Sequence, residues 1–389
     1  MRILYVNPYY KPYLGGIERI IERVGGELLA QDQVEAVGVL TTRVHFPDRW
    51  MTDVPSREQL DGIDVFRCRF YPSRIPRVFH AALAGYVSPQ VASVVSSFKP
   101  DVIHFTYSEW WGANLAIYLS TLGLPHVLST FFHGNPHIWS TAPMYGVNRW
   151  LVPRMHAVHV LTEMERQQVH EAYSVPLQHA VVIPPGVDVV PRIRVRDRED
   201  ATTILAVGRL NQDKGQLDLV RMAAKLRQTS GMPPLRVWLV GENAGAEAEV
   251  KEYCRRNDLD DVVQVFGNVS DEDLLALYQK ADIFALPTRV ESFGLVFLEA
   301  MAHGIPVVTY GVGPVPTILT RGAVLVSPGD EAGFCRSLAD LILTPQRQRE
   351  LGNEGHELVR GLYSWRTMAH RLLAVYEETL RAPLNLDLI

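Results

Sequence analysis

Two glutamates with seven residues between them, Glu291 and Glu299, enclose a Phe-Gly pair in the second half of the chain. Residues 281–287 before them are apolar and predict a buried strand, and the apolar spacing from Gly294 onward predicts a helix. The N–H groups of a helix's first turn lack intrahelical partners and carry partial positive charge, so they can bind oxygen-rich ligands. The pair therefore indicates either a ligand with two hydroxyl-bearing rings joined by a diphosphate or a solvated helix with two surface acids.

A second group of polar residues follows the strand that we expect at Thr203–Val207. The strand ends at Gly208, and Arg209 and Lys214 lie on the loop and first turn that enter the next helix. Glycine allows close approach of the backbone to a ligand, arginine offers a bidentate fork and lysine a point charge for phosphate oxygens. This loop predicts a diphosphate site that needs no metal ion.

Two acidic triplets, 258–260 and 271–273, resemble the Asp-x-Asp motifs that bind metal ions. The first lies in a polar turn, and the second follows Ser270 at a predicted helix start, where acids are expected on electrostatic grounds. We therefore expect neither a metal site nor a cofactor.

These residues need a scaffold, and the length and the pattern of the chain predict one. The chain has 389 residues, of which 47% are hydrophobic and 21% charged, and this length suits two domains. Short apolar segments alternate with longer amphipathic ones twice along the chain, which is typical of parallel sheets covered by helices. We expect strands at Ile3–Asn7, Val34–Thr41, Ile63–Arg69, Asp101–Phe105, His126–Thr130, Ala157–Leu161 and Ala180–Ile183 in the first half. In the second half we expect them at Thr203–Val207, Leu235–Val240, Val262–Phe266, Ile283–Leu286, Pro306–Thr309 and Ala323–Val326.

The predicted fold is thus α/β, with two doubly wound, Rossmann-like domains whose parallel sheets face each other across a cleft. The first domain is expected at 1–188 and the second at 189–363, with a helix and tail at 364–389. The boundary follows from the turn residues and charges at 184–200, where the strand pattern stops. Ligands of open parallel sheets bind beyond the carboxyl ends of the strands.

The net charge of −5 lies wholly in the second half of the chain, so we expect no nucleic-acid partner. The three cysteines, Cys68, Cys254 and Cys335, have no metal-ligand spacing and fit a reducing compartment. The first residues resemble a buried strand rather than a signal peptide. These features predict a cytoplasmic protein.

A basic and aromatic segment runs from Arg67 to Arg77 and includes Arg69 and Arg74, with no acid between residues 65 and 100. A solvated domain edge is the commoner explanation of such a segment. It could also contact the inner face of the membrane as a peripheral patch, or face an acidic substrate. The uncharged stretch Val78–Phe98 that follows contains polar residues and predicts a soluble helix.

The order and spacing of these motifs resemble those of GT-B glycosyltransferases similar to glycosyltransferase family 4, over essentially the whole chain. The resemblance rests on Glu291–Glu299 with its Phe-Gly pair, on Gly208–Leu210 with Lys214-Gly215, on the glycine pair Gly15-Gly16, and on Pro184–Asp188. It implies transfer, with retention, of a hexosyl unit from a nucleotide sugar, with UDP- or GDP-sugars the expected donors. It also implies a C-terminal helix that returns to the first domain.

The resemblance also implies a role for each matched residue. Glu291 would contact the donor hexose and Glu299 the ribose, while Arg209 and Lys214 would bind the diphosphate. The remaining expected contacts are Gly208, the amides of Phe293, Gly294 and Leu295, the glycines Gly15 and Gly16, and Asn268 near the nucleobase. His133 is the candidate that reaches the donor sugar, with His104, His126 and His137 as competitors.

One departure concerns Thr317, which stands where many family members have a glutamate in a Gly-Gly-x-Pro-Glu loop. This change bears on the choice of donor. The aromatic, weakly charged loops of the first half favour a saccharide or lipid-linked acceptor. Two other functions stay open at this stage: a catalytically silent subunit that binds a nucleotide sugar, and a sugar-nucleotide epimerase of the same fold.

Overall fold

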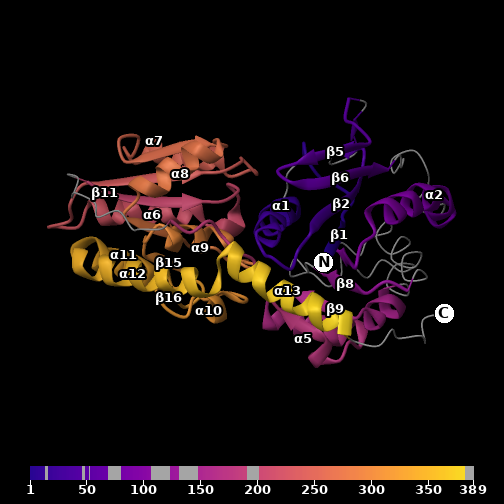
Figure 1. Cartoon of the computed structure of the whole chain (residues 1–389). Coiled ribbons are helices and arrows are strands. Elements are labelled where there is room, and N and C mark those ends of the chain that lie inside the picture. Colours follow the sequence, from indigo (N-terminus) through magenta and orange to yellow (C-terminus); the bar gives the residue numbers. More distant parts are fainter. Residues whose placement is uncertain are drawn as a thin grey trace. The chain divides into compact units, whose positions relative to one another are not determined.

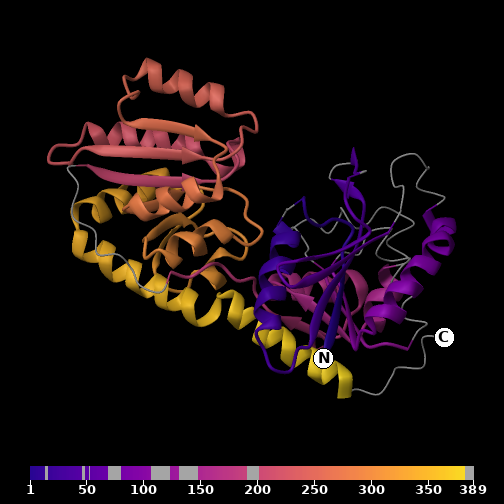
Figure 2. The ribbon, with the colours of Figure 1, turned by 45° about the horizontal axis from the view of Figure 1, so that its top comes forward.

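The structure, a computed structural model, describes residues 1–13, 16–45, 49–51, 53–68, 80–106, 123–130, 148–190 and 201–381 (Figure 1). The chain divides into two compact units. The first consists of residues 1–186 together with 365–389, and the second of residues 187–364. Each unit contains its own sheet of mainly parallel strands with helices on both faces (Figure 2).

The sheet of the first unit has the strand order β10-β9-β8-β7-β1-β2-β6-β5. All neighbouring strands are parallel except β5 and β6. The strands are β1 (Arg2–Val6), β2 (Ala36–Thr42), β5 (Arg57–Leu60), β6 (Ile63–Cys68), β7 (Val102–Phe105), β8 (His126–Ser129), β9 (Ala157–Val160) and β10 (Ala180–Val182), with a separate hairpin of β3 (Val44–His45) and β4 (Arg49–Trp50). The α-helices among the described residues of this unit are α1 (Gly16–Leu29), α2 (His80–Phe98), α5 (Glu163–Tyr173) and α13 (Trp365–Arg381).

Alternation along the central strand explains why both faces of this sheet are covered. Leu4 and Val6 on β1 pack into a core shared with α2 and α5, whereas Ile3 and Tyr5 pack into a core shared with α1 and α13. Successive side chains of a strand point to opposite faces, so an almost continuous apolar run buries both. The sequence of β1 is such a run.

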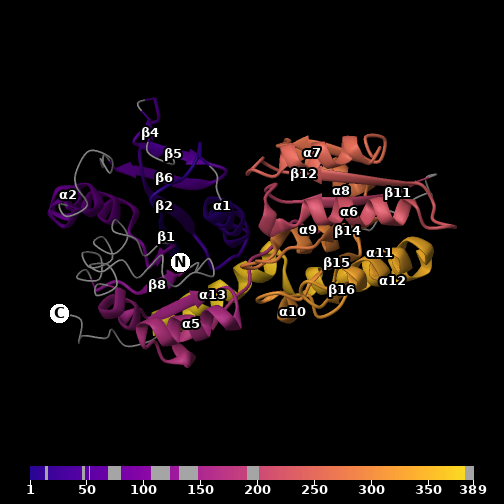
Figure 3. The same cartoon turned by 180° about the vertical axis from the view of Figure 1, so that it is seen from behind.

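The C-terminal helix α13 belongs to the first unit, as the sequence predicted. It lies beside α1, as the opposite views of Figures 1 and 3 show, and it buries Met368, Leu372 and Tyr376 in the first unit's core. The apolar stripe of this amphipathic helix covers one face of the first sheet.

A chain of buried hydrogen bonds fastens α13 to this sheet. The bonds join Tyr5 Oη to Tyr376 Oη (2.9 Å), Tyr376 Oη to His104 Nδ1 (2.6 Å), His104 Nε2 to Ser129 Oγ (2.7 Å), Ser129 Oγ to His159 Nδ1 (2.6 Å) and His159 Nε2 to the Ile183 carbonyl (2.7 Å). Because a carbonyl only accepts, His159 carries its proton on Nε2, and its Nδ1 accepts from the Ser129 hydroxyl. It follows that His104 Nε2 donates to Ser129, that the Tyr376 hydroxyl donates to His104 Nδ1, and that the Tyr5 hydroxyl donates to Tyr376. Burial lowers the pKa of His159 to about 4 and that of His104 well below its ordinary value, so both imidazoles are neutral.

The prediction that residues 67–77 form a surface patch is wrong for Arg67, which is buried. Its side chain is 1% exposed, forms an ion pair with Glu58 and donates to the Lys11 carbonyl at 2.8 Å. Glu58 lies on β5, which pairs antiparallel with β6 and brings this acid to Arg67. The other arginines of the patch lie outside the described residues.

The helix expected at Val78–Phe98 is present as α2, with Pro89 inside it. Among the residues that the structure describes, no helix has the length and apolar character needed to cross a membrane.

The sheet of the second unit is entirely parallel, with the strand order β13-β12-β11-β14-β15-β16 (Figure 3). Its strands are β11 (Thr202–Val207), β12 (Leu235–Val240), β13 (Val263–Gly267), β14 (Ile283–Leu286), β15 (Val307–Tyr310) and β16 (Ala323–Val326). Its helices are α6 (Gln216–Arg227), α7 (Glu247–Arg256), α8 (Asp271–Lys280), α9 (Leu295–Ala302), α10 (Val315–Ile318), α11 (Glu331–Leu343) and α12 (Pro345–Leu362).

The direction of winding reverses between β11 and β14 in this sheet. From β11 the chain proceeds outward to β12 and β13, and it then returns to β14 and proceeds the other way to β15 and β16. Loops that leave two adjacent strands in opposite directions create a crevice at the carboxyl edge, where doubly wound proteins bind their ligands. The first sheet has the corresponding reversal between β1 and β7.

Candidate active site

The two polar loops singled out in the sequence follow the two strands at this reversal. The loop after β11 carries Gly208, Arg209 and Lys214, and the loop after β14 leads through Glu291 to α9. Because β11 and β14 are neighbours in a parallel sheet, both loops emerge at the same edge. Residues about eighty positions apart in the sequence are thus brought together.

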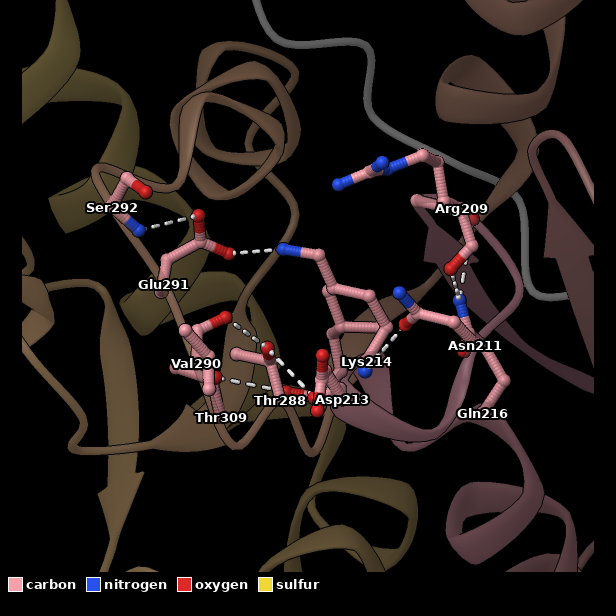
Figure 4. A network of polar contacts seen from close by, with 12 residues as sticks. Arg209, Asn211, Asp213, Lys214, Gln216, Thr288, Val290, Glu291, Ser292 and Thr309 are labelled. Atoms are coloured by element: carbon pink, nitrogen blue, oxygen red, sulfur yellow. Dashed lines mark hydrogen bonds and ion pairs between the residues drawn. The ribbon is translucent and has the colours of Figure 1, made fainter. Parts of the chain in front are cut away.

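Lys214 and Glu291 form the contact between the loops (Figure 4). The lysine Nζ donates to the Glu291 Oε2 at 2.7 Å, and the two side chains are only 19% and 10% exposed. The other carboxylate oxygen, Oε1, accepts from the backbone N–H of Ser292 at 3.1 Å. Both oxygens of Glu291 are therefore engaged, and the carboxylate is held in one orientation.

A brace behind this pair fixes the distance between the loops. The backbone N–H of Arg289 donates to the Asp213 carbonyl at 2.7 Å, and the buried Thr288 hydroxyl lies 3.2 Å from the same oxygen. The Arg289 guanidinium donates to the Gln212 carbonyl and to Asp218 on α6, each at 2.6 Å. The brace holds Lys214 against Glu291 through backbone atoms on both sides.

Each of the two loops contains a glycine that its local geometry requires, and Gly215 is the one that lies against the other loop. Gly215 has φ +72°, and a Cβ at this position would lie 2.3 Å from the Pro287 carbonyl oxygen. Gly294, the residue before α9, has φ +90°, and a Cβ there would lie 2.5 Å from the Phe297 ring. Only glycine adopts such backbone angles at no steric cost and leaves this space empty.

Arg209 is exposed, and its guanidinium makes no hydrogen bond or ion pair with the part of the chain that the structure describes. Its backbone, by contrast, is fixed. The side chain of the buried Gln216 donates to the carbonyls of Gly208 and Arg209 at 3.2 and 2.9 Å. Gly241 packs from the other side, where a Cβ would lie 2.1 Å from the Gly208 carbonyl oxygen. The backbone of the loop is thus fixed, and it presents the exposed Arg209 guanidinium near Lys214.

Glu299 lies on α9 and is half-buried. Its Oε2 accepts a hydrogen bond of 2.8 Å from the hydroxyl of Tyr278 on α8. The two acids of the sequence motif therefore have different surroundings, since Glu291 contacts a cation and Glu299 a neutral donor. Lys214 and the neighbouring Arg209 could bind an anion beside the first acid, and hydroxyl groups could be bound at the second.

The sequence and the fold both match known proteins. Residues 192–358 match the family of glycosyl transferases group 1, and residues 15–186 match the glycosyl transferase 4-like domain. Together these two matches cover most of the chain. The chain belongs to the glycosyltransferases of the GT-B fold.

Two relatives illustrate the range of this similarity. A glycogen synthase of Mycobacterium tuberculosis is 25% identical over 97% of this glycosyltransferase and 94% of its own length. A D-inositol 3-phosphate glycosyltransferase of Kineococcus radiotolerans is 31% identical over 57% of this chain and 56% of its own.

Solved structures share the fold at lower identity. Sucrose-phosphate synthase from Thermosynechococcus elongatus matches with a TM-score of 0.75 and 21% identity, covering 98% of this chain and 100% of that one. An Anabaena protein in complex with UDP matches with a TM-score of 0.70 and 19% identity, covering 97% and 100%.

The remaining predicted donor-site residues of this glycosyltransferase lie on the second unit. Phe293 is buried and packs edge-to-face on Tyr363, and Leu295 is the first residue of α9. Asn268 is exposed and follows the edge strand β13. Thr317, at the departure from the family pattern, is exposed on α10 and donates to the Pro314 carbonyl at 2.8 Å.

Gly16, a predicted contact on the first unit, is the first residue of α1. Two residues further on, the buried carboxylate of Glu18 accepts from Asn7 Nδ2 at 2.8 Å, and Asn7 Oδ1 accepts from the Thr106 hydroxyl at 2.8 Å. This contact joins the carboxyl ends of β1 and β7, where the first sheet reverses. Gly15 lies outside the described residues.

His133, the candidate histidine, also lies outside the described residues, as does its competitor His137. The competitors His104 and His126 are buried. His104 belongs to the hydrogen-bond chain that fastens α13, and His126 Nδ1 lies 2.9 Å from the Leu124 carbonyl. Both are accounted for by structural contacts.

The acidic triplet at 271–273 starts α8, where Ser270 caps the helix and accepts from the Asp273 N–H at 3.1 Å. This is the helix start that the sequence predicted. No group of three or more potential metal ligands occurs within the ranges that the structure describes.

Proposed function

We propose that this glycosyltransferase moves a hexosyl unit from a nucleotide sugar to a saccharide or lipid-linked acceptor, with retention of configuration and without a metal ion. The observation that carries the proposal is the meeting of Arg209, Lys214 and Glu291 on two loops at the reversal of the second sheet. Two cations beside a hydroxyl-binding carboxylate suit a sugar joined to a diphosphate.

In the proposed mechanism the bond between the sugar and the diphosphate breaks first, and negative charge develops on the leaving oxygen. The Lys214 ammonium and the Arg209 guanidinium stabilise that charge, and removal of one such preorganised donor typically costs about 3 to 4 kcal/mol of the barrier. The cations thus do the work that a metal ion does in other transferases. His133 completes the proposed catalytic set, and its role rests on the sequence resemblance.

The surroundings of Glu291 support attack of the acceptor from the front face. A carboxylate that accepts from Lys214 and from the Ser292 N–H is a poor nucleophile, because both oxygens are already engaged. Glu291 is better suited to orient hexose hydroxyls, while a phosphate oxygen of the leaving group takes the acceptor's proton. The sugar then keeps its anomeric configuration without a covalent intermediate on the protein.

A thermal screen with UDP-, GDP- and ADP-sugars tests the donor site. A ligand at 100 times its Kd stabilises the folded state by about 2.7 kcal/mol, which moves the melting temperature by several degrees. UDP-sugars come first, because solved structures of the Anabaena protein of similar fold are complexes with UDP and with UDP-glucose. If none of these donors raises the melting temperature, the donor-site proposal is wrong.

Activity measurements with the donor so identified test the rest. We expect transfer to proceed in excess EDTA, and the product to have the donor's anomeric configuration by NMR. Glu299→Ala should weaken binding of the nucleotide, whereas Glu291→Ala should spare nucleotide affinity and abolish turnover. Inversion of configuration, or loss of activity in EDTA that Mg²⁺ restores, would contradict the mechanism.

A further inference from the structure

Tyr278 contacts the acid that the proposed function assigns to the ribose. Its hydroxyl donates to Glu299 Oε2 at 2.8 Å, and its side chain is buried. Burial, and then the charge of Glu299, raise the pKa of Tyr278 well above its ordinary value. At neutral pH the residue is therefore a protonated donor to a carboxylate, which is one of the stronger kinds of hydrogen bond.

Two aromatic rings pack against the Tyr278 ring. It stacks on His303 with a centroid separation of 5.2 Å and an interplanar angle of 9°, and on Phe284 at 6.4 Å and 22°. The Nδ1 of His303 in turn lies 2.9 Å from the Glu299 carbonyl, which can only accept, so this nitrogen carries a proton. Glu299, Tyr278 and His303 form a closed cycle of contacts between α8 and the end of α9.

We propose that Tyr278 is a positioning residue that orients the Glu299 carboxylate toward the two adjacent hydroxyls of a ribose, and so makes the donor site selective for ribonucleotides. This inference rests on the proposed function. A carboxylate has about four lone-pair positions, so the tyrosine bond is compatible with bonds from two hydroxyls. A carboxylate that is already oriented has less rotational freedom to lose when the ligand binds.

The discriminating experiment compares nucleotides that differ only in these hydroxyls. UDP and 2′,3′-dideoxy-UDP are titrated calorimetrically into the wild type and Tyr278→Phe, with the GDP or ADP pair in their place if the thermal screen selects one of those. The substitution keeps the stacked ring and removes only the hydroxyl. Tyr310→Phe, at a buried tyrosine on β15 of the same unit, is the matched control.

We expect Tyr278→Phe to weaken UDP binding about five- to tenfold, and to leave dideoxy-UDP binding within about twofold of the wild type. Tyr310→Phe should change neither. In a Glu299→Ala background Tyr278→Phe should have no further effect, because the carboxylate that it orients is absent.

Four results would overturn the inference. If Tyr278→Phe weakens both nucleotides equally, the residue only supports the fold, and if it weakens neither, it does not position Glu299. If the wild type binds UDP and dideoxy-UDP equally well, Glu299 does not contact the ribose, although the donor site itself stands. If the wild type binds none of the three nucleoside diphosphates, the proposed function fails and this inference fails with it.

Discussion

The substitution Gly215→Ala tests whether the two loops must stay close, because it adds one methyl group where they meet. The added Cβ would lie 2.3 Å from the Pro287 carbonyl oxygen, and contacts below 3.0 Å do not occur in real proteins, so Gly215→Ala must move the loops apart by at least 0.7 Å. The displaced backbone carries the bonds to the Asp213 carbonyl, and loss of such bonds costs about 1 kcal/mol each. The separation of Lys214 from Glu291 grows by a similar distance.

A misplacement near 1 Å can lower a rate about 100-fold, so we expect Gly215→Ala to reduce kcat/KM for the donor by about that factor. The control is Gly231→Ala. Gly231 has a similar φ, +80°, but nothing lies within 4 Å of its Cβ position. Both variants acquire left-handed strain of about 1 to 2 kcal/mol, which a thermal melt would register. Only Gly215→Ala should lose activity, and equal losses in both variants would refute the argument that the loop separation matters.

Three further predictions concern the polar contacts. Lys214→Met and Glu291→Gln should each lower kcat/KM by about 100-fold or more. Because the two residues act as a pair, the double variant should lose less than the product of the two single losses. A loss equal to that product would show that the residues act independently. The contribution of His159 to the free energy of unfolding should be constant above pH 6.5 and fall by about 2 kcal/mol by pH 5. The reason is that its pKa of about 4 in the folded state lies below its pKa in the unfolded state, so the unfolded chain binds more protons in this pH window. Urea titrations of wild type and His159→Gln should therefore differ in how steeply the free energy of unfolding changes with pH. Tyr376→Phe should destabilise the first unit by about 1 to 3 kcal/mol, because it leaves His104 Nδ1 without its donor, and calorimetry should find nucleotide affinity unchanged.

The strands of both sheets could be predicted because their apolar runs are short, β-branched and separated by turn residues. β12 (Leu235–Val240), β14 (Ile283–Leu286) and β16 (Ala323–Val326) have the bounds that the sequence predicted, and the other predicted strands differ by one or two residues at either end. β5 was missed, since Arg57–Leu60 is polar and lies at the sheet edge, where one face is not buried. That omission also hid Glu58, the partner of Arg67, and so led to the wrong surface assignment.

The residue types of the site could be read from the sequence, but their pairing could not. Nothing in the sequence indicates that β11 and β14 are neighbours, and the contact between Lys214 and Glu291 depends on that adjacency. The sequence assigned the two residues to different parts of a ligand. Tyr278 was missed because a tyrosine at helical spacing is indistinguishable from a core residue until its hydroxyl is seen to reach Glu299.

The place of α13 in the first unit has a consequence for synthesis on the ribosome. The face of the first sheet that this helix covers is complete only after residues 365–381 have emerged, and residues 187–364 are translated in between. At about 5 to 20 residues per second, those residues take roughly 10 to 35 s, during which apolar side chains of α1 and β1 lack their cover. The second unit is contiguous and can fold in that interval. The unit whose synthesis starts first is thus the one completed last.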